Sequence, residues 1–178
     1  MSLANRGRAW EAVIDDQHAI YERAGLASCV KNPAPMKPLG KAVKGVFRAV
    51  YTAEGPPDYT VMSRGGCYIL DAKEHEGRWP LAKLPDHQAA RFSAHMRQGG
   101  WAGVLLRTEA GIWLLPWERR AGGGLRPLWE RWKAGRAARG EASLAPADCD
   151  AVGMRLRSSD WLTGASILFG EVPLVRSA

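Results

Sequence analysis

The chain has 178 residues, of which 46% are hydrophobic, and this length and composition fit one domain with a real hydrophobic core and exclude a disordered tail. The formal net charge of +7 favours a polyanionic partner, because Lys and Arg displace the counterions condensed on nucleic acid. The cysteines, Cys29, Cys67 and Cys149, lie far apart and in no CxxC pair, which argues against a disulfide framework and a structural zinc site. We find no apolar signal core and no run of membrane-span length, so a reducing cytoplasm is the expected location and no membrane partner is expected.

The first predicted element is a helix over residues 3–24. Apolar residues recur there at three- and four-residue steps, and Gly25 ends the pattern. Glu11, Asp15 and His18 form a polar stripe beside the apolar one. Such a stripe is typical of a solvated helix face, and the alternative is that Glu11 leans over the end of a sheet toward a metal. Residues 26–30 form a short apolar run that predicts a strand.

A basic segment follows, and we expect an insertion over residues 32–56. Not one acidic residue occurs between Arg23 and Ala53, and the prolines at 33, 35 and 38 favour extended chain. Residues 43, 46, 47, 50 and 51 are apolar at helical spacing, although Gly45 weakens a helical interpretation. The absence of acidic residues favours contact with phosphates over ordinary solvated lysines. The cations are Lys31, Lys37, Lys41, Lys44 and Arg48.

Residues 57–73 carry the strongest candidate for chemistry. Two β-like runs, 59–62 and 67–70, flank a Ser-Arg-Gly-Gly turn and predict a hairpin. Antiparallel pairing then brings Asp58 and Asp71 to the same end of the hairpin, and Lys73 points to the same face as Asp71. Mg²⁺ prefers such sites, with one or two carboxylates and a substrate phosphate. The alternative is an ordinary solvated pair on a strand.

The rest of the chain alternates helices and strands. We predict a helix over residues 84–98, strands over 101–107 and 111–116, and a helix over 127–139 in which Trp129 and Trp132 anchor the core. The tail from Gly140 is weakly patterned, and residues 160–162 are expected to dock it on the body. This order predicts an α/β fold with a mixed sheet and helices on its faces.

Several short motifs, taken together, resemble a RecU-type Holliday junction resolvase of the PD-(D/E)xK nuclease superfamily. They are Asn5-Arg6-Gly7 with Glu11, Val30-Lys31-Asn32-Pro33-Ala34-Pro35, Pro57-Asp58-Tyr59, Asp71-Ala72-Lys73, His87-Gln88 and Gly99-Gly100. The similarity runs from about Asn5 to Trp117 and becomes faint beyond. The chain departs from the family in having Asp71 where Glu is usual, and its basic segment is somewhat shorter than the family's stalk.

The resemblance implies a restriction-endonuclease-like fold and a homodimer that nicks four-way DNA junctions in symmetric pairs during recombination and repair, alongside recombination proteins. We expect a single nuclease domain over 1–178, a stalk-like insertion over 32–56, and an irregular C-terminal segment over 140–178 packed on the body. The implied location is the cytoplasm, or the host cytoplasm for a viral protein.

The resemblance also implies Mg²⁺, or Mn²⁺, as cofactor. The implied metal ligands are Asp58, Asp71, Glu11 and the Ala72 carbonyl, and Lys73 and Gln88 complete the implied catalytic set. The expected DNA-binding residues are Arg6, Lys31, Lys37, Lys41, Lys44, Arg48 and Arg64.

Two other functions remain open from the sequence. One is an endonuclease of the same fold that acts on ordinary duplex DNA in restriction or repair, although a base-reading segment rich in Asn, Gln and Arg is missing. The other is a basic DNA-binding module without catalysis, against which the intact Asp58, Asp71 and Lys73 set argues.

Overall fold

The computed structural model describes residues 3–44, 46–51, 53–119, 122–136 and 142–169; within them, the side chains at 3–6, 42–43, 46–47 and 51 are not described. The helices are α1 Leu3–Arg23, the 3₁₀ helix η1 Leu81–Lys83, α2 Asp86–Arg97, α3 Arg126–Lys133, α4 Pro146–Val152 and α5 Trp161–Phe169. The strands are β1 Ala27–Lys31, β2 Met36–Val43, β3 Val46–Tyr51, β4 Tyr59–Ser63, β5 Gly66–Glu74, β6 Trp79–Pro80, β7 Trp101–Thr108, β8 Gly111–Pro116, β9 Ser143–Leu144 and β10 Met154–Leu156. None of the described helices is long and apolar enough to cross a bilayer.

The centre of the molecule is a six-stranded mixed sheet in the order β1-β4-β5-β7-β8-β10. All neighbouring strands in it are antiparallel except β5 and β7. Helix α2 lies between these two parallel strands in the chain, because a parallel pair needs a crossover connection. The β4–β5 hairpin forms around Arg64 and Gly65, and its register pairs Tyr59 with Leu70 and Met62 with Cys67.

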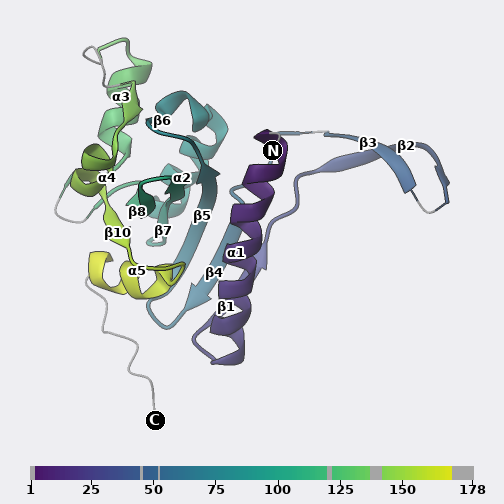
Figure 1. The fold of residues 1–178 in the computed structure, drawn as a ribbon, viewed down its shortest axis with the longest axis horizontal. Coiled ribbons are helices and arrows are strands. Elements are labelled where there is room, and N and C mark those ends of the chain that lie inside the picture. Colours follow the sequence, from purple (N-terminus) through teal and green to yellow (C-terminus); the bar gives the residue numbers. More distant parts are fainter. Residues whose placement is uncertain (1–2, 45, 52, 120–121, 137–141, 170–178) are drawn as a thin grey trace.

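Helices cover both faces of this sheet (Figure 1). On one face, α1 and α5 bury a cluster that includes Trp10, Ile14 and Trp161. The indole of Trp10 also donates a hydrogen bond of 3.0 Å to the carbonyl of Leu105, so α1 is fixed to the sheet by both packing and a buried polar contact. On the other face, α2 and α4 bury a second cluster, and α3 packs against it through Trp129 and its neighbours. This architecture confirms the predicted α/β class, and the partly buried Trp129 and Trp132 confirm the predicted core anchors.

The predicted helical spacing over residues 43–51 is wrong, because this segment forms the second half of the β2–β3 hairpin. The hairpin extends to the right of the body in Figure 1 as a two-stranded sheet of its own. Val43 and Val50 are β-branched and therefore favour strands, and the pairing shifts register between Leu39 and Val43. The apolar residues at three- and four-residue steps therefore belong to a ribbon and not to a helix.

The C-terminal segment is also more regular than predicted. Its described part contains β9, α4, β10 and α5, and β10 pairs with β8 as the edge of the main sheet. The expected docking at residues 160–162 is confirmed, since the Tyr21 hydroxyl donates 2.7 Å to Asp160 and the Trp161 indole donates 3.0 Å to His18. The helix predicted over 127–139 ends at Lys133, and residues 137–141 lie outside the described chain.

Candidate functional site

The β4–β5 register brings Asp58 and Asp71 together. Tyr59 is paired with Leu70, so the residue before Tyr59 lies opposite the residue after Leu70 at the same end of the hairpin. The backbone carbonyl of Asp58 accepts a 2.7 Å hydrogen bond from the backbone N–H of Asn32. Its side-chain carboxylate accepts another 2.7 Å hydrogen bond, from the backbone N–H of Ala72. The predicted meeting of the two carboxylates is therefore what the fold produces.

Asp71 is the most buried acid of the site, with no exposed side-chain surface. One carboxylate oxygen accepts a 2.7 Å hydrogen bond from Gln88 on α2, and the other forms an ion pair with Lys73. A buried carboxylate needs such partners, because an unpaired charge in the interior is very costly. Gln88 and Lys73 thus compensate the charge of Asp71 and fix its orientation, whereas their parts in catalysis stay predictions.

The carboxyl group of Asp58 has an unusual proton affinity. Burial and then the neighbouring Asp71 carboxylate raise its pKa, the Ala72 amide and Lys73 oppose the shift, and the net result is a pKa of about 7. Two acids this close cannot both be charged cheaply without a cation between or beside them. A carboxyl group whose pKa is raised by burial and by a neighbouring carboxylate, as that of Asp58 is, is typical of a functional site.

The donor set fits a hard divalent cation with few protein ligands. Among the described residues, no group of three or more His, Cys, Asp or Glu side chains gathers in one place, so the acids of the site are the pair Asp58 and Asp71. A pair is enough for Mg²⁺, which usually keeps several waters and shares a substrate phosphate. In addition, the side-chain oxygen of Gln88 is buried without a hydrogen-bond partner among the described residues, and it is positioned to accept a hydrogen bond from a bound water.

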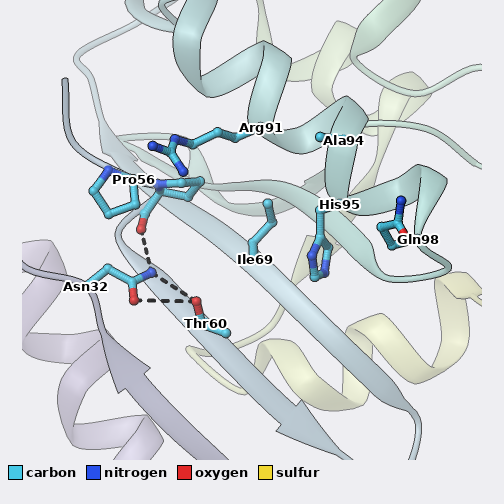
Figure 2. A pocket seen from close by; sticks show the side chains of 9 residues that line it. Asn32, Pro56, Thr60, Ile69, Arg91, Ala94, His95 and Gln98 are labelled. Carbon is cyan, nitrogen blue, oxygen red and sulfur yellow. Dashed lines mark hydrogen bonds between the residues drawn. The ribbon is translucent and has the colours of Figure 1, made fainter.

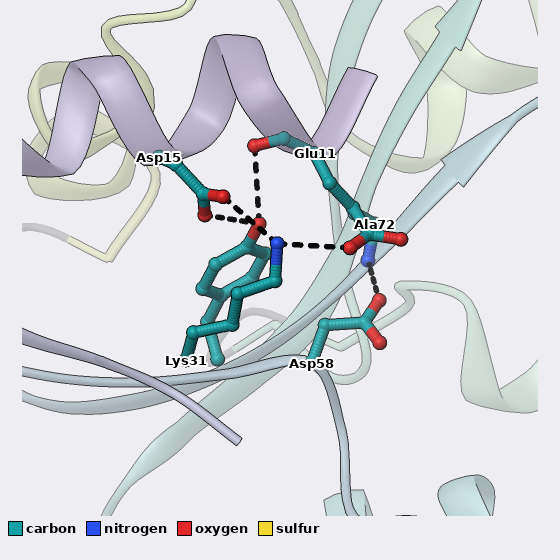
Figure 3. Close-up of polar contacts among 6 residues, drawn as sticks. Glu11, Asp15, Lys31, Asp58 and Ala72 are labelled. Atoms are coloured by element: carbon teal, nitrogen blue, oxygen red, sulfur yellow. Dashed lines mark hydrogen bonds and ion pairs between the residues drawn. The ribbon is translucent and has the colours of Figure 1, made fainter. Parts of the chain in front are cut away.

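Glu11 approaches this site from α1 but is engaged by another residue. Its carboxylate forms an ion pair of 3.0 Å with Lys31, whose ammonium also lies 2.8 Å from Asp15 (Figure 3). The Tyr59 hydroxyl donates 2.8 Å to Asp15 and lies 3.2 Å from the Glu11 carbonyl. Glu11 as a metal ligand and Lys31 as a phosphate contact stay predictions, and the structure adds that each neutralises the other.

The polar stripe on α1 is not uniformly solvated. His18 is buried, and burial lowers its pKa to about 4, so the ring is neutral and accepts the Trp161 indole hydrogen bond. Asp15 and Tyr59 belong to the network around Lys31, and sequence reasoning missed them as site residues. The signal was the four-residue spacing of Glu11 and Asp15, which places both on one face of the helix.

The cations of the insertion project on the β2–β3 hairpin, and those described are exposed and without ion pairs among the described residues. The register pairs Lys37 with Val50 and Leu39 with Arg48, so Lys37 and Arg48 share one face. Lys41 lies within the irregular stretch between Leu39 and Val43, and Lys44 follows the last residue of β2 with a left-handed φ of 52°. The hairpin thus carries uncompensated positive charge away from the body.

The remaining two predicted DNA contacts are less informative. Arg64 is exposed in the β4–β5 turn, beyond the opposite end of β4 from Asp58, or about 20 Å away at the usual rise per residue. The side chain of Arg6 lies outside the described residues, although its backbone belongs to α1.

The family model described as "Recombination protein U" (RecU) matches residues 5–134. The chain belongs to the RecU family. The matched range contains α1, the projecting hairpin, the Asp58–Asp71 pair, α2 and α3, so it includes every residue of the candidate site.

Three curated relatives are between 24% and 30% identical to this chain. The Holliday junction resolvase RecU of Streptococcus gordonii is 30% identical over 117 residues, which cover 60% of this chain and 56% of that protein. The RecU of Bacillus pumilus is 25% identical over 133 residues, covering 67% and 65%, and that of a Geobacillus species is 24% identical over 146 residues, covering 73% of each. The chain thus spans less than two thirds of the first two relatives. A solved structure of the Holliday junction resolvase Hjc from Archaeoglobus fulgidus aligns with 13% identity and a TM-score of 0.43 over 82% of this chain and 94% of that one, a likeness too slight to carry an argument.

Proposed function

We propose that this chain is a metal-dependent, structure-selective endonuclease that resolves four-way DNA junctions by paired nicks. The observation that carries the proposal is the Asp58–Asp71 pair, with Lys73 and Gln88 on Asp71, in a RecU-family chain whose basic hairpin projects beside it. The acid pair with Lys73 can support phosphodiester hydrolysis, and the projecting cations can bind the phosphates of a branched nucleic acid.

Each residue has a distinct part in the proposed reaction. Asp58, Asp71 and the Ala72 carbonyl would hold Mg²⁺, or Mn²⁺, with Glu11 as a further ligand once it leaves Lys31. When bound, the cation would lower the pKa of a water and offset charge on the scissile phosphate. Lys73 is 22% exposed, and its ammonium is therefore close enough to solvent to meet the attacking water or the phosphate while it compensates Asp71. Gln88 fixes Asp71 through its amide nitrogen and offers its oxygen to the water.

We also propose a homodimer that works in the cytoplasm on junctions formed by recombination. A four-way junction has approximate two-fold symmetry, and resolution into two intact duplexes needs two nicks at related positions. A closed dimer with isologous contacts provides two sites related in that way.

The test is a cleavage assay on a four-way junction beside a linear duplex of the same sequence, with Mg²⁺ and with EDTA. Junction-selective, Mg²⁺-dependent nicks at symmetric positions are expected. Equal cutting of both substrates would replace the proposal with a general duplex nuclease, and binding without any cutting in Mg²⁺ or Mn²⁺ would replace it with a non-catalytic DNA-binding module. Light scattering of the chain with junction DNA checks the dimer.

A further inference from the structure

An open pocket of about 390 Å³ lies on the α2 face of the sheet, beside the Asp58–Asp71 pair. Its floor is formed by Thr60 and Ile69, which are paired across β4 and β5, and one wall by α2 (Figure 2). The opposite wall comes from Asn32 and the prolines at the base of the insertion. The volume falls in the range of about 300–1,000 Å³ that is usual for small-molecule and cofactor sites.

The pocket and the acid pair are consecutive positions along the same sheet face. Side chains alternate between the two faces of a strand, so the Thr60–Ile69 pair points to the same side as the next-but-one pair, Asp58 and Asp71. Two residues along a strand correspond to about 7 Å. A phosphate held at the carboxylates would therefore have its neighbouring nucleoside over the pocket.

One stripe of side chains, on α2 and at its C-cap, lines both the acid pair and the pocket. Gln88, which binds Asp71, is followed at three, seven and ten residues by Arg91, His95 and Gln98, which line the pocket. At 1.5 Å per residue, this stripe runs about 15 Å along the helix. The side chains of Arg91 and Gln98 have no hydrogen bond or ion pair with other described residues, so their donors are available.

His95 makes this wall rigid. Its Nε2 lies 3.0 Å from the Cys67 carbonyl, which can only accept, so Nε2 carries a proton and donates it to that carbonyl. Gly100 packs directly against the ring, and a Cβ at that position would come within 2.1 Å of Nε2. The glycine at 100 is thus required by the ring.

We propose that this pocket binds the nucleoside next to the scissile phosphate, and that Gln98 reads its base and so determines which step of the junction is cut. This inference rests on the proposed function. Ile69 and Ala94 offer apolar surface to a base or sugar, Arg91 offers a cation to an adjoining phosphate, and a glutamine amide pairs with the edge of a base such as adenine.

Such a pocket also favours branch points. A base must leave its stack to enter a pocket, and the free-energy cost of doing so is lowest where pairing is already interrupted. The centre of a four-way junction is such a place, so base reading and structure selectivity would reinforce each other at the same site.

The test maps nick positions on a junction whose branch point migrates through several base steps. Gln98→Ala is expected to spread the nicks over more steps and to lower the rate at the preferred step about tenfold, with junction affinity within about twofold of wild type. Arg97→Ala, at the exposed neighbouring position outside the pocket, is the matched control and should keep the wild-type pattern. An unchanged distribution of nicks in Gln98→Ala would overturn the inference.

A second variant fills the pocket without disturbing the core. Ala94 is exposed and lines the pocket, so Ala94→Tyr should fold normally and slow cleavage at least about tenfold while keeping junction affinity and oligomeric state. Undiminished cleavage by this variant refutes the pocket as a nucleoside site, and a changed oligomeric state in light scattering assigns it to a protein interface instead. A wild-type chain that cuts no junction refutes the proposed function and this inference with it, whereas a cutting wild type with insensitive variants refutes the pocket alone.

Discussion

Replacing the four cations of the β2–β3 hairpin with Ala should flatten the salt dependence of junction binding. The cations are Lys37, Lys41, Lys44 and Arg48, and all are exposed without ion pairs among the described residues. Each phosphate contact adds about 0.9 to the slope of log affinity against log salt concentration on B-form DNA. The size of the loss reports how many of the four meet phosphates.

The geometry of the hairpin sets two limits for that loss. Lys37 and Arg48 share one face, so DNA lying along that face alone would remove about 1.8 from the slope. A junction that surrounds the hairpin would engage all four cations and remove about 3.6. When salt rises from 50 to 200 mM, the variant would lose about 12-fold less affinity than the wild type at the first limit. At the second limit it would lose about 150-fold less.

The assay is fluorescence anisotropy in EDTA, on a four-way junction and on a linear duplex of the same sequence. A charge-matched control removes four exposed cations from the body, which are Lys83, Arg97, Arg131 and Arg136. The hairpin variant should lose slope mainly on the junction, and the control should affect both substrates alike. Parallel losses on both substrates in the hairpin variant would refute the reasoning, since the hairpin would then be a general phosphate binder.

Three further predictions concern the body. Asp71→Asn should abolish Mg²⁺-dependent cleavage and leave junction binding near wild type, because the amide keeps a hydrogen-bond acceptor for Gln88 but loses the charge. Undiminished cleavage by this variant would show that Asp71 is not a catalytic residue. Lys31→Ala should change the salt slope by well under about 0.9 and reduce cleavage more than binding, because Glu11 and Asp15 already neutralise this ammonium. A change of about 0.9 in the slope would instead identify Lys31 as a phosphate contact. The free energy of unfolding should fall by about 2 kcal/mol through His18 between pH 7 and 5, because its folded pKa of about 4 lies below its ordinary 6.5 and only the unfolded chain gains the proton there. Urea denaturation of wild type and His18→Asn at both pH values checks this, and an equal pH dependence in the two would contradict it.

The part of the site that sequence predicts well is the part that local rules determine. A short turn with glycine fixes the register of the β4–β5 hairpin, and a period of two then decides which side chains share a face. Asp58, Asp71 and Lys73 follow from those rules alone. Gln88 does not, because its contact with Asp71 depends on how α2 docks on the sheet, and the sequence indicated it only through the family resemblance.

The β2–β3 hairpin was misread for a physical reason. Alternation of apolar and polar residues arises when one face of a strand is buried, and this ribbon stands apart from the core with its described side chains exposed. Without a buried face, the hairpin has no period-two pattern to detect. Its basic composition and its prolines were the informative features, and they indicated an extended segment.

The run of cations from Lys31 to Arg48 looks uniform in the sequence, but the fold divides it into two kinds. Lys31 lies at the end of β1 in the main sheet, where α1 presents Glu11 and Asp15 to its ammonium. The hairpin cations meet no acid among the described residues. Within this run, the uncompensated positive charge is therefore on the projection, whereas Lys31 is neutralised by Glu11 and Asp15. Under the proposed function, phosphates would be attracted first to the hairpin, because Lys31 is paired with Glu11 and Asp15 and Lys73 is paired with Asp71.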